Sequence, residues 1–137
     1  MNSLYEKGNN PLLDKSLELA LFFAGKITEY KEEDNYSIKS YLSQISRSSS
    51  SIPANVAEAQ PPITAKHKYS KLNIAFGECY ETRMFIEILH KANILSETEY
   101  LYTIGLCDEI GKMLNRSLYN LNQKINDSNK KTKTEKA

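Results

Sequence analysis

The chain has 137 residues, of which 40% are hydrophobic and 26% are charged, as is typical of one globular domain. Its 18 Lys and Arg against 17 Asp and Glu give a formal net charge of +1, which disfavours a strongly basic nucleic-acid binder and an acidic disordered chain. No apolar run approaches the roughly 18 residues of a membrane helix, and residues 1–10 lack the apolar centre of a secretory signal. We therefore expect a cytoplasmic protein in which Cys79 and Cys107 are reduced, buried thiols.

The first predicted helix follows an N-terminal arm of residues 1–9. Asn10 can cap this helix, and Pro11 suits its first position because proline has no N–H to leave unpaired. Apolar residues then recur at steps of three and four, and two adjacent phenylalanines widen the apolar surface. An Asp-Asn pair directly after residues 32–33 is the expected break, so the helix should end near Glu33.

The second predicted helix carries apolar residues at three- and four-residue steps from Ile38 to Val56. Pro53 lies inside this pattern and cannot donate a hydrogen bond to the carbonyl of Ser49. The helix should therefore kink at Pro53. Pro61-Pro62 ends the pattern.

The third and fourth predicted helices are separated by a short connection. The third begins near Thr64 and ends near Asn93. Residues 96–99 read SETE, a capping-box pattern in which the first and last side chains satisfy each other's backbone N–H, and this pattern opens the fourth helix. The apolar stripe of the fourth helix continues to Ile125.

Four amphipathic helices with short connections predict an all-α, up-down-up-down antiparallel four-helix bundle over residues 10–127. The apolar residues of the first and third helices cover more than one face, which favours an oligomer interface. Residues 128–137 hold four Lys and one Glu without an apolar anchor, so we expect a disordered basic tail there.

Catalytic and metal-binding patterns are sparse. Glu87 and His90 form an E-x-x-H pair on one helical face, but the second pair of a di-iron bundle is missing. A Glu and a His near an exposed helix end are the favoured interpretation, and a metal-dependent enzyme is the alternative. Nucleophile elbows, Ser-x-x-Lys patterns and Gly-rich phosphate loops are absent from the sequence. We expect no enzymatic activity, no metal and no cofactor.

Polar residues in the second and third helices can meet across the bundle. If the turn lies near Pro62, antiparallel partners have residue numbers that sum to about 124. Arg47 then lies beside Gly77 and Glu78, with Glu81 one turn away. We expect a buried or half-buried network that fixes the helix register, and Arg47→Ala should then cost a few kcal/mol. A ligand or RNA site on the same groups is the alternative.

Basic residues are concentrated in the middle of the chain and in its tail. Tyrosines are interleaved with them and could stack on bases. A solvated helix end is the simplest interpretation for one chain, but an oligomer would repeat the basic patch and accumulate phosphate contacts. The candidate nucleic-acid-binding residues are Arg47, Lys66, His67, Lys68, Lys71, Arg83 and Arg116.

Two blocks of sequence resemble a known family. Residues 44–59 (QISRSSSSIPANVAEA) and residues 71–82 (KLNIAFGECYET) are similar to the paired motifs of the bacterial four helix bundle proteins. That family was first noticed as products of intervening sequences within large-subunit ribosomal RNA genes. It also includes the accessory variability determinant of diversity-generating retroelements. Residues 10–16 resemble one branch of the family, and the likeness spans about residues 10–121.

The resemblance implies a bundle that assembles as a homo-oligomer, typically a ring-like pentamer. For retroelement members it also implies binding to a reverse transcriptase and to RNA through a basic surface. We therefore expect a non-enzymatic adaptor for RNA or a ribonucleoprotein, with a protein–protein scaffold as the alternative. The family-motif residues, to which we assign structural roles first, are Arg47, Ser51, Pro53, Asn55, Glu58, Gly77, Glu78 and Glu81.

Overall fold

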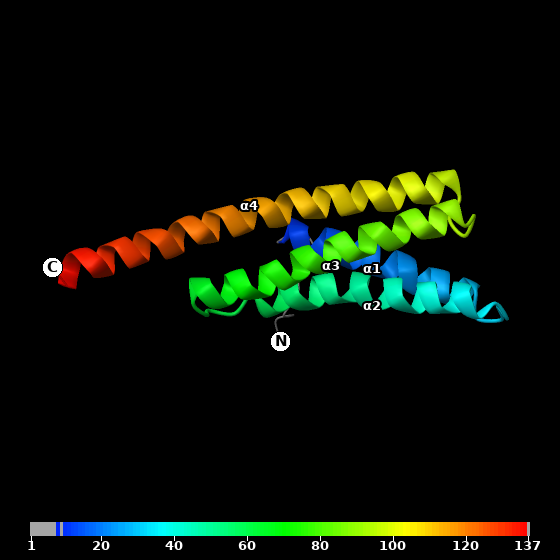
Figure 1. Ribbon diagram of the computed structural model, residues 1–137, viewed down its shortest axis with the longest axis horizontal. Helices are drawn as coiled ribbons and strands as arrows, with labels where there is room; N and C mark the ends of the chain where they lie inside the picture. The colour runs from blue at the N-terminus through cyan, green and yellow to red at the C-terminus, as the bar shows by residue number, and fades with distance from the viewer. Residues whose placement is uncertain (1–7, 9, 137) are drawn as a thin grey trace.

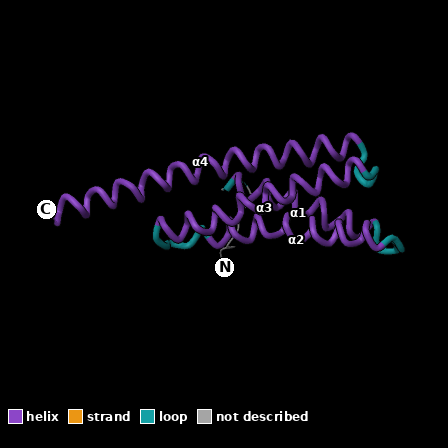
Figure 2. Tube along the Cα trace, in the orientation of Figure 1, coloured by secondary structure: helices purple, strands orange, loops and turns teal. Residues whose placement is uncertain are grey.

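The computed structural model describes Gly8 and residues 10–136, which form four helices and no strand. Figure 1 shows them as an antiparallel bundle, and Figure 2 shows short connections at its ends. Each helix packs against the next one in the chain, and the last packs less extensively against the first. The expected up-down-up-down architecture is confirmed. The helices are α1 (Pro11–Glu29), α2 (Tyr36–Glu58), α3 (Ala65–Lys91) and α4 (Glu97–Lys136).

Side-chain caps start the first three helices where the sequence predicts. The Asn10 side chain accepts the backbone N–H of Leu13 at 3.1 Å. Asn35 caps α2 and Thr64 caps α3 in the same way, each at 3.2 Å. Such caps satisfy backbone donors that have no partner within the helix, so they fix where each helix begins.

The first helix ends at Glu29, four residues before the expected position. The backbone N–H of Tyr30 closes the last turn on the carbonyls of Lys26 and Ile27. Residues 32–34 are Glu, Glu and Asp, and negative charge opposes the partial negative charge at a helix C-terminus. This repulsion accounts for the earlier end of α1.

The connection from α3 to α4 is defined by two local motifs. Asn93 adopts a positive φ of 63°, a conformation that Asn tolerates at the end of a helix. The expected capping box is confirmed, because Ser96 Oγ accepts the Glu99 N–H at 3.1 Å and Glu99 Oε1 accepts the Ser96 N–H at 2.9 Å. Together these motifs reverse the chain within a few residues.

The second helix continues past Pro53, whose ring is buried. The kink at this position stays a prediction. The core lies between the four helices, and its largest fully buried side chains include Phe23 of α1, Ile45 of α2, Ile86 of α3 and Leu114 of α4. Within the described residues, none of the helices has the length and apolar composition needed to cross a membrane.

The C-terminal residues differ from the sequence expectation. Residues 128–136 continue α4 as a helix instead of forming a disordered tail. They contain neither Gly nor Pro, and the preceding helix is already formed, so each further residue adds a hydrogen bond without a nucleation cost. The arm predicted over residues 1–9 lies outside the described residues except for Gly8.

Candidate functional site

Arg47 of α2 pairs with two carboxylates of α3. Its Nη2 lies 2.6 Å from Glu81 Oε1, and its Nη1 lies 3.6 Å from Glu78 Oε2. The predicted pairing is present, with Glu81 as the nearer partner. Of the buried or half-buried network that the sequence predicts, the carboxylates of Glu78 and Glu81 are half-buried, but the Arg47 side chain is 58% exposed. A surface ion pair contributes little to stability, and the large loss expected for Arg47→Ala does not follow.

A second polar contact between α2 and α3 lies inside the bundle. The Thr82 hydroxyl lies 2.9 Å from Ser48 Oγ, and both residues are fully buried. The Ser48 hydroxyl donates in turn to the carbonyl of Ile45. Sequence reasoning missed this pair, although both residues lie one position after the Arg47 and Glu81 that it did consider.

The remaining motif residues extend the row of polar side chains along α2 and α3, which we call the polar seam. Asn55 Nδ2 donates to the Ser51 carbonyl at 2.8 Å and lies 3.1 Å from the Ser51 hydroxyl. Glu58 forms an ion pair with Lys71 of α3 at 2.9 Å. Gly77 faces open space. Of these contacts, the Glu58–Lys71 ion pair joins α2 to α3, whereas the contacts between Asn55 and Ser51 lie within α2.

The candidate basic residues fall into two groups. Three of them, Arg47, Lys71 and Arg83, are neutralised by carboxylates, with Asp108 as the partner of Arg83. The others show no ion pair with a described carboxylate. They are Lys66, His67 and Lys68 in the first turn of α3, and Arg116 of α4.

Lys68 and Arg116 line the same hollow, which has a volume of about 470 Å³. The hollow lies where the start of α1 and the end of α2 meet α3 and α4. Among the described residues, its polar lining consists of these two cations, the side chains of Asn10, Gln60 and Asn120, and Ser117, with no Asp or Glu. Two positive charges without a carboxylate between them make this hollow suited to an anion.

Charge is segregated along the bundle. Figure 1 shows α4 projecting beyond the end at which α3 begins, and this projection carries exposed lysines at positions 124, 130, 131 and 133. The opposite end carries carboxylates at residues 32–34 and at Glu97 and Glu99. The net charge of +1 therefore conceals one basic end and one acidic end.

The E-x-x-H pair is occupied by other side chains. The Tyr100 hydroxyl donates to Glu87 Oε1 at 2.7 Å, and this bond raises the pKa of Tyr100. His90 Nε2 lies 2.8 Å from Glu97 Oε2, and its ring stacks on Tyr100 at 3.9 Å. Within the described residues, no three His, Cys, Asp or Glu side chains are arranged to hold a metal ion.

Comparison with known proteins settles the family. The model of the 23S rRNA-intervening sequence proteins matches residues 9–116. The chain belongs to this family. The resemblance drawn from the two motif blocks is thereby confirmed, and in this family member those blocks form the polar seam between α2 and α3.

A solved structure has the same fold as this intervening-sequence protein. It is a protein of unknown function from the S23 ribosomal protein family of Bacteroides thetaiotaomicron, determined at 1.70 Å resolution. The two chains are 29% identical with a TM-score of 0.68, and the match covers 78% of this chain and 97% of that chain. No curated protein matches the chain.

Exposed apolar side chains remain on the two helices where the sequence predicts a surplus. On α1, Leu21 is 70% exposed. On α3, Ile74, Tyr80 and Met84 are 46%, 64% and 50% exposed. The adjacent phenylalanines that widen the apolar pattern of α1 are not among them, because Phe23 is buried in the core and Phe22 packs against it. Exposed apolar side chains also occur on α2 and α4, among them Tyr36 and Leu101.

Proposed function

We propose that this intervening-sequence protein is a non-enzymatic bundle that assembles with copies of itself and binds RNA, alone or within a ribonucleoprotein, through its basic end. The observation that carries the proposal is the hollow shared by Lys68 and Arg116. Lys66 and His67 lie in the same turn of α3 as Lys68, so the positive potential extends over the helix end. The lysines of the α4 projection add to it.

Phosphate groups would supply the negative charge that the cations of this end lack among the described residues. A phosphate in the hollow would meet two cations that have no carboxylate to neutralise them. Each phosphate neutralised by a Lys or Arg releases counterions, so affinity for RNA should fall steeply with salt. The ion-paired Arg47, Lys71 and Arg83 contribute less, because RNA must compete with the carboxylates that they already contact.

Self-association would multiply a patch that is modest in one copy. The helices α1 and α3 do not pack against each other, so their exposed apolar residues are two separate surfaces that neighbouring copies would cover. A pentamer is the favoured assembly because the chain resembles proteins that form ring-like pentamers. Several basic ends presented together would bind one RNA with much higher avidity than one end. A reverse transcriptase is a further partner suggested by the same resemblance.

The decisive experiment measures binding of a fluorescently labelled single-stranded RNA by anisotropy over a range of salt concentrations. In the double variant Lys68→Glu/Arg116→Glu, affinity should fall at least tenfold. The slope of log affinity against log salt concentration should become shallower by the contribution of about one to two phosphate contacts. The matched control is Lys39→Glu/Lys91→Glu, which changes the net charge equally with two exposed lysines at the other end of the bundle. Equal losses in both variants, or no salt-dependent binding by the wild-type chain, would contradict the proposal.

A protein–protein scaffold without a nucleic-acid role is the second candidate, favoured by the exposed apolar side chains of α3. Size-exclusion chromatography with light scattering separates the two candidates when absorbance is read at 260 and 280 nm. The chain has 9 Tyr and no Trp, so co-purifying nucleic acid would be conspicuous. Excess absorbance at 260 nm that is lost in high salt supports RNA binding, whereas a clean oligomer supports the scaffold.

A further inference from the structure

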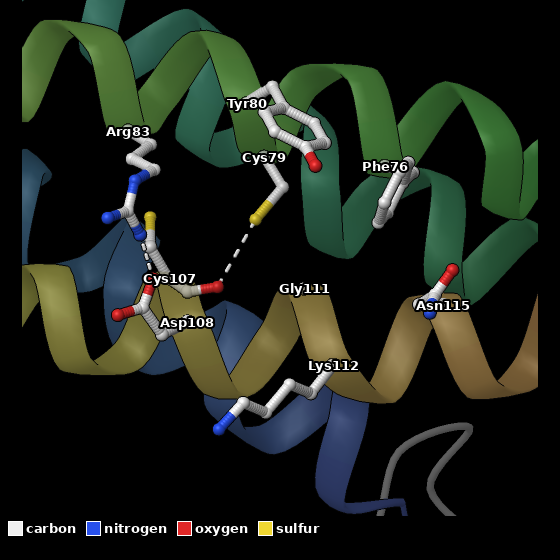
Figure 3. A pocket seen from close by; sticks show the side chains of 9 residues that line it. All are labelled: Phe76, Cys79, Tyr80, Arg83, Cys107, Asp108, Gly111, Lys112 and Asn115. Carbon is white, nitrogen blue, oxygen red and sulfur yellow. Dashed lines mark hydrogen bonds and ion pairs between the residues drawn. The ribbon is translucent and has the colours of Figure 1, made fainter.

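A groove of about 460 Å³ runs between α3 and α4, away from the basic hollow. It brings together both cysteines of the chain, which are 28 residues apart in sequence. Figure 3 shows Cys79 on α3 and Cys107 on α4, with aromatic side chains of α3 beside them. The lining residues are Phe76, Cys79, Tyr80, Arg83, Cys107, Asp108, Gly111, Lys112 and Asn115.

The Cys79 thiol is in contact with the residue that carries the second thiol. Cys79 Sγ lies 3.5 Å from the backbone carbonyl oxygen of Cys107, so this side chain reaches the backbone of α4. Both cysteines are free, and they are only 5% and 2% exposed. Packed helices are roughly 8–10 Å apart at their axes, and facing Cα atoms then approach within the separation of about 4.4–6.8 Å that a disulfide requires.

The surroundings make the two thiols chemically different. The neighbouring Cys107 thiol lowers the pKa of Cys79, and the positive charge of Arg83 adds to this effect. The neighbouring Cys79 thiol, together with burial, raises the pKa of Cys107. Arg83 is held in place by its ion pair with Asp108, the residue that follows Cys107. Cys79 is therefore the first to form a thiolate, the reactive form of a cysteine.

We propose that Cys79 and Cys107 form a reversible thiol–disulfide site whose oxidant is a low-molecular-weight disulfide that enters the groove between α3 and α4. The Cys79 thiolate attacks one sulfur of the oxidant, forming a mixed disulfide and releasing one thiolate of the reagent. Cys107 then loses its proton and attacks Cys79 Sγ, which forms the Cys79–Cys107 bond and releases the second reagent thiolate. The protein loses two electrons and two protons, and one disulfide becomes two thiols.

The groove suits a small anionic disulfide such as oxidised glutathione. Lys112 and Asn115 line it without an ion pair or hydrogen bond to another described side chain, so they are available to the carboxylates and amides of the reagent. Phe76 and Tyr80, whose ring centroids are 5.1 Å apart, form an apolar wall. The groove shares Arg83 with the candidate basic residues and Tyr80 with the exposed apolar side chains of α3. It shares no residue with the hollow of Lys68 and Arg116, so the inference does not rest on the proposed RNA-binding role.

The test incubates the folded wild-type chain with oxidised glutathione and counts thiols after denaturation. We expect both thiols to be lost, with an intact mass lower by two hydrogen atoms and an unchanged chain length on a non-reducing gel. Dithiothreitol should restore both thiols. Persistence of both thiols in the folded chain, or oxidation that yields only cross-linked dimers, would overturn the proposal.

Serine variants test the order of the two steps. Cys107→Ser should stop at a mixed disulfide with glutathione, because the resolving thiol is absent. Cys79→Ser should react at least tenfold more slowly, because the remaining thiol has the raised pKa. Arg83→Gln should shift the pH profile of the first step upward, whereas Lys39→Gln, outside the groove, should leave it unchanged. Equal rates for the two serine variants would contradict the assignment of Cys79 as the attacking group.

Discussion

A single carboxylate, that of Glu99, holds two parts of the bundle together. It closes the capping box that starts α4, and its two oxygens lie 3.0 and 2.8 Å from Lys26 Nζ of α1. Lys26 is only 5% exposed and also contacts Glu29 at 3.2 Å. The ion pair thus joins α1 to α4 along the smallest helix–helix interface of the bundle.

Lys26→Ala should lower the free energy of unfolding by about 2 kcal/mol, because it removes a mostly buried ion pair and the packing of the lysine stem. Chemical denaturation followed by circular dichroism measures the change. Lys15→Ala is the matched control. Lys15 of α1 also forms an ion pair with a glutamate of α4, Glu109, but this pair lies at the surface. The two variants should differ clearly, and an equal effect would argue against burial as the cause.

The same pair predicts a pH dependence. Burial alone would raise the pKa of Glu99, but the hydrogen bonds from Lys26 and the Ser96 backbone outweigh it, so the pKa lies below 4.5. A carboxyl whose pKa is lowered by folding stabilises the fold above its unfolded pKa, and this stability is lost as the pH falls through the folded value. Glu99→Gln should therefore destabilise the chain near neutral pH and much less near pH 3. Glu109→Gln, at the surface pair, should show a smaller difference between the two conditions.

Among the four helices, α4 differs because it extends beyond the helices that pack against it. The last buried residue of α4 is Leu118. After it, Leu121 and Ile125 are half-buried, and residues 126–133 are exposed. The part after Ile125 makes no contribution to the core. Its helical form depends on the packed part of α4, which supplies the first turns.

Truncation separates these two parts of α4. A chain that ends at Asn126 should keep the melting temperature of the full chain, because residues 127–133, which it lacks, are exposed. A chain that ends at Ser117 should lose several kcal/mol, because Leu118 and Leu121 leave the core. Thermal denaturation measures both. A marked loss for the longer truncation product would show that the projection packs against another copy.

The helices could be predicted from the sequence because caps and apolar periodicity are local signals. Asn10, Asn35 and Thr64 each mark a helix start by themselves. The Asp-Asn pair predicts the end of α1 too late, because it marks the loop before α2 and not the last turn of α1. Counting residues predicts Glu78 or Glu81 as the partner of Arg47, but it does not predict that Glu81 is the nearer one. Side chains lean toward the N-terminus of their own helix, so partners meet past the level of their Cα atoms.

The candidate site was less predictable than the fold. A cation at the surface has several carboxylates within its reach. The sequence therefore could not show that Lys71 is neutralised by a described carboxylate while Lys68 is not. The pairing of Cys79 with Cys107 was within reach, since the antiparallel counting used for α2 and α3 also applies to α3 and α4. The separation of charge to the two ends required the bundle geometry, which brings the tail beside the start of α3.

For the whole molecule, the proposed assembly predicts that charge on α3 breaks it. Ile74→Glu/Met84→Glu places two charges on the exposed apolar face of α3 and should reduce the mass in solution to that of one chain. Tyr36→Glu/Tyr119→Glu is the control, with two exposed apolar residues on α2 and α4. Light scattering after size-exclusion chromatography measures the mass, and circular dichroism verifies that each variant is folded. A single-chain mass for the wild type would contradict the assembly itself.

The end of α4 that has no packing partner should become more ordered when a binding partner contacts it. A helical segment of about ten residues without tertiary contacts is marginally stable in water, so its backbone amides should exchange with solvent far faster than those of the core. Its lysines repel one another along the segment, and a polyanion laid against them removes that repulsion. Hydrogen exchange should then slow in this segment while the core amides, already protected, barely change. The projecting helix would thus report contact with a polyanion through its own rigidity.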